Sequence, residues 1–225
     1  MMAKIPVLSE EECDRIKAAL SAMTWQPGQA PSKEYAEKVK GNLELPMGIH
    51  KDADVHHQFI IDRLMKTKFF VRRSLPKNIG RPRFNLYKDG GFYGKHADSA
   101  FMGLNPEIRT DLSMTLFLND PDEYEGGGLR LEYTSGAVIE LKEPKGTVVV
   151  YPSGVLHEVL PVTKGERVAF VAWVESHIQD PYKRDLLAEI TMLCEDMSEV
   201  DNLSDLHIRM LNIKHNMFRQ WMKKA

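Results

Sequence analysis

Apolar residues recur at helical spacing near both ends of the chain and at alternating positions in its middle. Cys13, Ile16 and Leu20 lie three and four residues apart, directly after the capping-box pair Ser9 and Glu12, which predicts a helix over residues 10–23. Apolar residues at similar offsets predict a second helix over residues 55–70. Residues 30–50 are polar, and their pattern indicates no particular element.

The middle of the chain has the pattern of short strands. Within residues 111–119, Leu112, Met114, Leu116 and Leu118 alternate with other residues and share one face. Turn residues separate further extended stretches at 83–87, 92–98, 129–133, 137–141, 147–151, 156–162 and 167–175. Seven or eight short strands at this spacing favour a sandwich or barrel.

Two more helices are predicted after this segment, around residues 186–194 and 206–221. The expected architecture is therefore mainly β with flanking helices (α+β). We expect a helical region over residues 1–80 that packs on the core, a β core over 81–178, and a helical extension over 179–225. The extension could pack on a second copy of the chain, so a homo-oligomer is an open possibility.

Composition narrows the classes of partner. The chain has 225 residues, 43% of them hydrophobic, and a formal net charge of -2, so it has no electrostatic footprint for nucleic acid. Its two cysteines, Cys13 and Cys194, are far apart in the sequence and form neither a disulfide framework nor a zinc cluster. No apolar run is long enough to span a bilayer, and the first residues lack the apolar stretch of a signal peptide. We therefore expect a cytoplasmic protein without a membrane partner.

The segment with the clearest chemistry contains His96 and Asp98. In extended backbone, residues two apart point to the same side, so these two side chains can approach one metal ion. Two histidines and one carboxylate on one face of an iron ion leave three positions open for substrate, cosubstrate and O₂. The pair alone is a weak signal, because a surface turn with a His–Asp hydrogen bond would have the same pattern.

His157 and Arg167 strengthen the metal hypothesis. His157 follows a strand end and turn and has apolar neighbours, which makes it the candidate third ligand. Arg167 begins an apolar strand, and a guanidinium at the head of a buried strand requires an anionic partner. A dicarboxylate could chelate iron at one end and meet Arg167 at the other. The alternatives are a core histidine that donates to a carbonyl and a structural salt bridge from Arg167 to a nearby glutamate.

Five ordered segments give the sequence a family resemblance. Residues 83–87, 96–100, 109–118, 122–129 and 151–173 resemble the PKHD-type hydroxylases, which are 2-oxoglutarate/Fe(II)-dependent dioxygenases related to the prolyl hydroxylases. The resemblance implies a double-stranded β-helix (jelly-roll) core. It also implies Fe(2+) on His96, Asp98 and His157, 2-oxoglutarate on Arg167, O₂ as co-substrate, and a requirement for L-ascorbate (vitamin C).

The resemblance also suggests roles for three aromatic residues. A tyrosine on the strand before the first histidine contacts the cosubstrate in prolyl hydroxylases; Tyr87 is the best match and Tyr93 the second. Trp173 stands where the wider group often places an aromatic residue near the substrate. Ser99 and Gly128 depart from the family's usual Asn and Glu, so no substrate is carried over from it.

The predicted function is hydroxylation of an unidentified substrate, a small molecule or a protein residue, with release of succinate and CO₂. Hydroxylation of a prolyl or other residue of a protein partner stays open as an alternative. A nucleic-acid demethylase is disfavoured, because Trp173 stands where that group has a second arginine. A non-catalytic β-sandwich that binds a metal is the remaining alternative, and it would make no use of Arg167.

Overall fold

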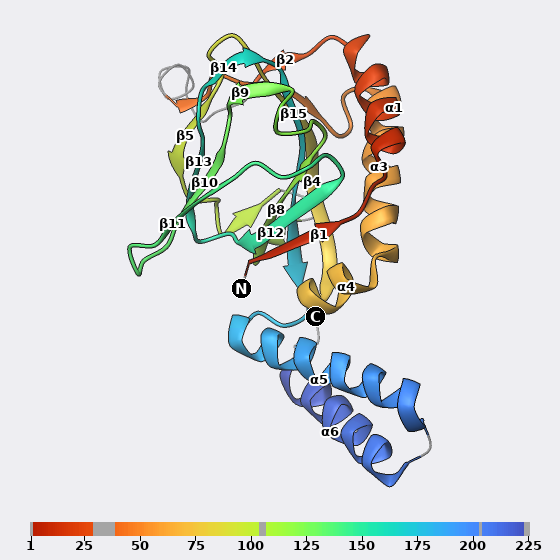
Figure 1. Cartoon of the computed structure of the whole chain (residues 1–225). Helices are drawn as coiled ribbons and strands as arrows, with labels where there is room; N and C mark the ends of the chain where they lie inside the picture. The colour runs from red at the N-terminus through yellow and green to blue at the C-terminus, as the bar shows by residue number, and fades with distance from the viewer. Residues whose placement is uncertain (1, 29–38, 104–106, 203, 223–225) are drawn as a thin grey trace.

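Two antiparallel sheets form most of the molecule (Figure 1). The computed structural model describes residues 2–28, 39–103, 107–202 and 204–222. Within them the larger sheet has the strand order β1-β12-β8-β15-β4-β3-β2, and the smaller has the order β11-β10-β13-β5. Every strand pair in both sheets is antiparallel, and chain neighbours often lie in different sheets. This is the arrangement of a jelly roll.

The bounds of the elements are as follows. The larger sheet contains β1 (Ala3–Pro6), β2 (Gln26–Pro27), β3 (Leu43–Pro46), β4 (Pro76–Tyr87), β8 (Leu112–Phe117), β12 (Thr147–Pro152) and β15 (Arg167–Ser176). The smaller sheet contains β5 (Tyr93–His96), β10 (Leu129–Glu132), β11 (Val138–Leu141) and β13 (Leu156–Val159). Two short pairs are β6 (Phe101–Met102) with β7 (Ile108–Arg109) and β9 (Tyr124–Gly126) with β14 (Val162–Gly165). The helices are α1 (Glu10–Ser21), α3 (Lys51–Lys66), α4 (Lys68–Ser74), α5 (Pro181–Asp201) and α6 (Asp205–Trp221).

The strand β8 shows how the two faces of the larger sheet are used. Its even residues, Leu112, Met114 and Leu116, join a core that also takes in the buried faces of α1 and α3. Its odd residue Phe117 joins a second core with residues of the smaller sheet, such as Leu131. Both faces of the larger sheet are therefore covered, and polar side chains on its inner face lie between the sheets.

The expected helices are present, with two corrections. The capping box of α1 is confirmed: Ser9 accepts from the Glu12 N–H, and the Glu12 carboxylate accepts from the Ser9 N–H. The helix ends at Ser21, two residues before the predicted end. The prediction of one helix over 55–70 is wrong. The helix α3 begins at Lys51 and ends at Lys66, and a second helix, α4, begins after Thr67. The Thr67 backbone is extended, and its N–H and hydroxyl both donate to the Arg63 carbonyl.

The strand predictions also need correction. The predicted strand 156–162 is two strands, because the chain leaves the smaller sheet after Val159 and β14 pairs with β9 instead. Pro161, between them, has no N–H to donate to a ladder. Short strands outside the predicted stretches are β1, β2, β3, β6, β7 and β9. The strand predicted at 83–87 is the end of the longer β4.

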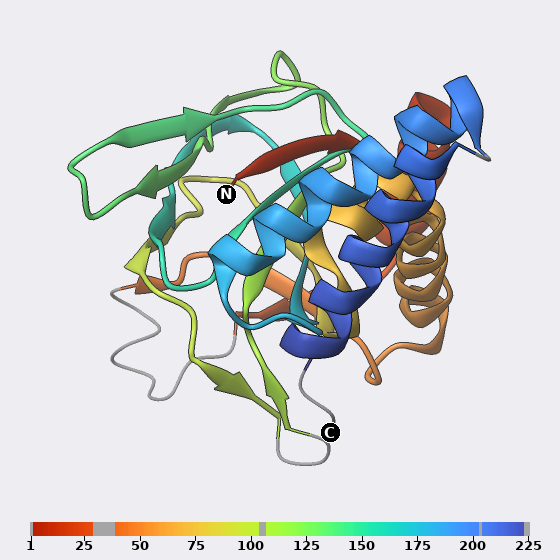
Figure 2. The ribbon, with the colours of Figure 1, turned by 90° about the horizontal axis from the view of Figure 1, so that it is seen from below.

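The helices lie in two places. The helices α1 and α3 run along the outer side of the larger sheet, and α5 and α6 form an antiparallel hairpin beyond one end of the core (Figures 1 and 2). The predicted fold class, a jelly-roll core with flanking helices, is confirmed. Of the described helices, none has the length and apolar character needed to cross a bilayer.

Candidate metal and cosubstrate site

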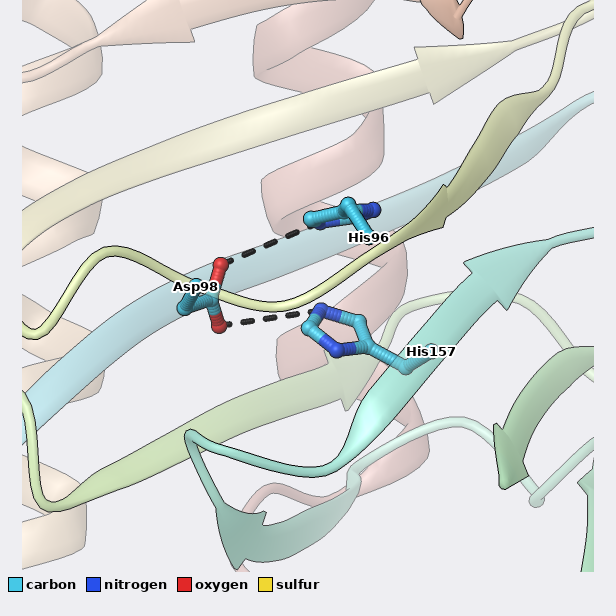
Figure 3. A group of neighbouring side chains, drawn as sticks. All are labelled: His96, Asp98 and His157. Carbon is cyan, nitrogen blue, oxygen red and sulfur yellow. Dashed lines mark ion pairs between the residues drawn. The ribbon is translucent and has the colours of Figure 1, made fainter. Parts of the chain in front are cut away.

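Three predicted side chains meet between the sheets. His96 is the last residue of β5, Asp98 lies just beyond it, and His157 in β13 is the cross-strand partner of His96. The Asp98 carboxylate faces both imidazoles, with Oδ1 3.8 Å from His96 Nε2 and Oδ2 3.6 Å from His157 Nε2 (Figure 3). One ligand atom from each residue lies within 4.8 Å of the others. Two imidazoles and a carboxylate at this spacing are the donor set of a non-haem iron site with open positions.

Backbone carbonyls fix the orientation of both imidazoles. His96 Nδ1 lies 2.8 Å from the Gly94 carbonyl oxygen, and His157 Nδ1 lies 2.9 Å from the Val155 carbonyl oxygen. A carbonyl can only accept, so we assign the ring proton to Nδ1 in each histidine. Each Nε2 then has a lone pair directed toward Asp98. Metal-binding histidines are commonly oriented in this way.

Hydrogen bonds from the larger sheet and from the turn after β12 position Asp98. The Ser113 hydroxyl on β8 donates to Asp98 Oδ2, and the Asp98 N–H donates to the Ser153 carbonyl oxygen at 3.3 Å. Because the proton of Ser113 is used on the carboxylate, the Ser153 hydroxyl donates to Ser113 Oγ, 2.8 Å away. This serine pair is a supporting feature that the sequence analysis missed. A serine on a strand gives no signal of its own.

The surroundings keep His96 neutral. Burial, together with the nearby His157, lowers the pKa of His96 to about 4. An imidazole that is neutral at pH 7 keeps its lone pair for a cation. The Tyr93 ring stacks on the His96 ring with centroids 3.8 Å apart and planes 15° apart. Tyr93 therefore packs on a candidate metal ligand.

Arg167 lies deep between the sheets, without a matching anion among the described residues. It is 1% exposed and stands opposite Tyr87 in the β15–β4 register. Its guanidinium carbon lies 5.1 Å from the Tyr87 ring centroid and 5.0 Å from that of Phe117. Among the described residues, Nε and Nη2 have no hydrogen-bond partner. The neighbouring Glu166 pairs with Lys88 instead, so the alternative of a salt bridge to that glutamate does not apply.

Tyr124 is a second residue that the sequence analysis did not assign. It is buried, and its hydroxyl makes no hydrogen bond of ordinary geometry to the described residues. Burial raises the pKa of Tyr124, and the charge and hydrogen-bonding contact of the nearby Arg167 oppose this shift. The ring packs closely on the glycines that follow it, since a Cβ on Gly127 would lie 2.9 Å from the Tyr124 ring. Tyr124 and Arg167 therefore lie beside each other between the sheets.

A pocket connects the three metal-type residues with the inner face of the larger sheet. Three of the predicted aromatic residues, Tyr87, Tyr93 and Trp173, line it together with His96, Asp98 and His157, whereas Arg167 does not reach its lining. The rest of the lining is Asn85, Ser113, Met114, Thr115, Leu129, Tyr151, Val159 and Val171. The pocket therefore combines a metal-type corner with a mixed polar and apolar wall.

A chain of hydrogen bonds supports Tyr87 in this wall. The Asn85 amide donates to the Tyr87 hydroxyl at 3.5 Å, and the Asn42 amide donates to Asn85 Oδ1 at 3.3 Å. Glu44, 1% exposed, accepts from Arg83, which lies over the Trp173 ring at 5.2 Å. The Trp173 indole N–H is buried and has no partner among the described residues. Polar groups therefore surround both aromatic residues.

Comparison with known proteins agrees with this geometry. Residues 82–175 match the 2OG-Fe(II) oxygenase superfamily. A prolyl-4-hydroxylase of Pseudomonas putida shares the fold with a TM-score of 0.57 and 22% identity, covering 78% of this chain and 92% of that one. A prolyl hydroxylase of Trichoplax adhaerens, solved with a peptide fragment of hypoxia inducible factor, has a TM-score of 0.60 and 12% identity and covers 77% and 83%. Fold, donor set and match define a 2-oxoglutarate- and Fe(II)-dependent oxygenase.

Sequence identity assigns the chain to one family within these oxygenases. A PKHD-type hydroxylase of Acidovorax ebreus is 39% identical over 221 residues, which cover 96% of each chain. The chain belongs to the PKHD-type hydroxylases. It is an oxidoreductase that uses O₂ and 2-oxoglutarate as co-substrates and depends on Fe(II).

Proposed function

We propose that His96, Asp98 and His157 hold the Fe(II) of this dioxygenase and that Arg167 binds the far carboxylate of 2-oxoglutarate. The observation that carries the first assignment is the pair of Nε2 atoms directed at one carboxylate. The observation that carries the second is the buried guanidinium with unpaired Nε and Nη2. When bound, iron and 2-oxoglutarate supply the oxidising chemistry: O₂ converts the keto acid to succinate and CO₂ while a substrate C–H becomes C–OH.

The protein groups have separate tasks in this proposal. The carbonyls of Gly94 and Val155 keep the imidazoles in the tautomer that a metal requires. Ser113 fixes the carboxylate rotamer of Asp98. Arg167 orients the cosubstrate from the far end, where its charge makes bidentate hydrogen bonds to a carboxylate.

Of the two tyrosine candidates, we favour Tyr87 as the cosubstrate contact. It is the cross-strand neighbour of Arg167, whereas Tyr93 stacks on His96. Tyr124 is an additional candidate, because its buried hydroxyl lies beside the Arg167 guanidinium. We keep Trp173 as the substrate-side residue, since it lines the pocket and has an unpaired N–H.

The primary substrate is either a small molecule or a residue of a protein partner. The Trichoplax neighbour was solved with a peptide, and its likeness in fold keeps a prolyl or other peptidyl substrate as the second candidate. Assays on peptides and on small molecules, each read by succinate release, separate the two. A non-catalytic sandwich is disfavoured by the family and by the unpaired Arg167.

Four further features complete the proposal. They are stimulation by L-ascorbate, a cytoplasmic location, assembly into a homo-oligomer, and a division into a helical region over 1–80, an oxygenase core over 81–178 and an extension over 179–225. The ascorbate requirement follows from the family resemblance alone. It is tested by measuring turnover with and without ascorbate at fixed Fe(II).

The metal and cosubstrate assignments are tested together. Under anaerobic conditions, Fe(II) plus 2-oxoglutarate should give the wild-type protein a weak visible charge-transfer band, and turnover should release succinate. The variant His157→Ala should lose the band and the turnover, while His56→Ala on α3 should keep both. Equal turnover in wild type and His157→Ala would remove His157 from the site.

A further inference from the structure

The C-terminal hairpin carries apolar residues that the rest of the described chain leaves exposed. It consists of α5 and α6, which pack side by side beyond the core (Figures 1 and 2). Ion pairs join α5 to α4, between Arg72 and Glu195 and between Arg73 and Glu189. The hairpin is therefore attached to the core along α5 only at one side.

Five apolar residues form a regular stripe along α5. They are spaced 4, 3, 4 and 3 residues apart: Leu186, Ile190, Leu193, Met197 and Val200. Leu193 is 51% exposed and Val200 is 81% exposed. A stripe with alternating spacings of three and four is the seam of a coiled coil or helical bundle. A solvent-facing side of a surface helix would be polar instead.

A matching stripe runs along α6. Its residues are spaced 4, 3 and 4 apart: Leu206, Met210, Ile213 and Met217. Leu206 is 57% exposed and Ile213 is 53% exposed. We call these nine residues of the two stripes the hairpin face.

Both stripes lie on the same side of the hairpin. A cleft lined by α3, α4, α5 and α6 marks the core-facing side of the hairpin, and Thr191, Lys214 and Phe218 line it. At about 100° per residue, Thr191 lies about 160° around α5 from Leu193, and Phe218 lies about 140° around α6 from Ile213. The hairpin face therefore turns away from the core. It contains no charged residue.

The size of the hairpin face suits a second copy of this chain. α5 has 21 residues and α6 has 17. Helices of these lengths, about 10 Å apart, present a surface of about 600 Å² per copy, close to the roughly 800 Å² per partner of a standard interface. An apolar patch of this size on a helix pair marks an interaction site. Two such faces packed together would form a four-helix bundle.

Charges at the edges select one arrangement of the two copies. Cys194 of α5 lies near Lys214 of α6, and at about 100° per residue Asp196 lies about 160° around α5 from Cys194 and Arg209 about 140° around α6 from Lys214, so both are on the outer edges of the hairpin. Lys183 stands over Trp221, and Cys194 lies near Lys214, so Asp196 and Arg209 are near the same height along the hairpin. A twofold axis parallel to the helices brings Asp196 of one copy beside Arg209 of the other. An axis across the helices would bring the acidic edges of two α5 helices together.

We propose that two copies of this chain pack their hairpin faces together, with α5 of each copy against α6 of the other and the twofold axis parallel to the helices. The hairpin face is self-complementary, because the apolar stripe of α5 in one copy meets the apolar stripe of α6 in the other, and the two stripes have the same residue spacing. The partner surface is far from the pocket between the sheets. The proposal therefore stands or fails independently of the assigned metal ligands.

The test is sedimentation of the purified full chain. The wild type should be a dimer at micromolar concentrations. The double variant Leu193→Glu/Ile213→Glu should raise the dissociation constant by about a thousandfold or more, because four carboxylates would be buried without partners. The matched control Val55→Glu changes a 67% exposed apolar residue on α3 and should remain a dimer. Circular dichroism checks that all three proteins are folded.

A charge exchange tests the arrangement itself. Asp196→Arg alone should weaken the dimer, and Asp196→Arg/Arg209→Asp should restore it. A monomeric wild type up to about 100 μM, a dimer that survives the double glutamate variant, or an assembly of three copies would each overturn the proposal. So would a charge exchange that fails to restore the affinity lost in Asp196→Arg.

Discussion

At the metal-type corner of the pocket, the proposed ligands have hydrogen-bond partners, whereas Arg167, which lies outside the pocket lining, is buried and has unpaired donors among the described residues. His96 and His157 each donate to a carbonyl, and Asp98 accepts from Ser113. Arg167 Nε and Nη2 have no partner among the described residues. The metal end is thus organised before a ligand arrives, while the cosubstrate end becomes satisfied only when an anion binds. Variants at the two ends should therefore fail in different ways.

The largest effect is expected from the metal end. Asp98→Ala removes the carboxylate that faces both imidazoles, and turnover should fall by about a thousandfold or more, since metal binding and catalysis are lost together. Iron content after anaerobic loading, together with succinate release, measures this. Asp52→Ala, on the exposed side of α3, serves as the control with full activity. Unchanged iron content in Asp98→Ala would show that another group completes the site.

Arg167→Met should separate cosubstrate binding from iron binding. The KM for 2-oxoglutarate should rise by about a hundredfold or more, because charge-assisted hydrogen bonds to the carboxylate are lost. Without 2-oxoglutarate the variant should be as stable as the wild type or more stable by about 1 kcal/mol, because a buried unpaired charge has been replaced by an apolar side chain. Thermal unfolding with and without 2-oxoglutarate, at fixed metal, measures both effects.

Arg83→Met is the matched comparison for Arg167→Met. Arg83 pairs with Glu44, which is 1% exposed, so this variant leaves a buried carboxylate short of a partner and should be less stable than the wild type. Opposite signs for the two variants support the contrast between a paired and an unpaired arginine. A clear loss of stability in Arg167→Met without cosubstrate would mean that Arg167 is already paired in the free protein.

Ser113→Ala should have an intermediate effect. It removes the hydrogen bond that fixes Asp98, and losses of this kind lower metal affinity by about tenfold. Ser153→Ala should have a smaller effect, because Ser153 acts on Asp98 through Ser113 and its backbone carbonyl remains. Titration of Fe(II) monitored by the charge-transfer band measures both. Equal affinities in wild type and Ser113→Ala would show that the ion alone positions the carboxylate.

The contrast between the two ends also explains what the sequence could predict. Strand alternation placed Leu112, Met114, Leu116 and Leu118 on one face, and all four are in one core. The break at Thr67 was missed because apolar residues continue at helical spacing on both sides of it, and only the backbone hydrogen bonds reveal the end of α3. The local sequence pattern therefore predicted which helices and strands exist more accurately than it predicted the residues where they end.

For the site, the spacing of His96 and Asp98 was a weak signal alone, and His157, Arg167 and the family resemblance were needed to choose the residues that the fold brings between the sheets. Ser113 and Tyr124 were missed, because a hydroxyl on a strand becomes significant only when tertiary structure sets it beside a carboxylate or a guanidinium. The short strands β2 and β3 were also missed. They lie in or beside the mainly polar stretch, where Leu43 and Leu45 alternate over too few residues to predict a strand.

The smallest effects are expected from the two tyrosines. They distinguish a cosubstrate contact beside Arg167 from one beside the metal ligands. Tyr87→Phe should raise the KM for 2-oxoglutarate by about fivefold, because the hydroxyl beside Arg167 is lost while the ring under the guanidinium is kept. Tyr93→Phe should change this KM by less than about twofold, since a phenylalanine ring still stacks on His96.

Burial raises the pKa of Tyr87 to about 12. The hydroxyl therefore stays protonated, and the KM ratio between wild type and Tyr87→Phe should be constant between about pH 6 and 10. A ratio that falls as pH rises, or a larger effect in Tyr93→Phe, would move the cosubstrate contact from Tyr87 to the metal end of the pocket.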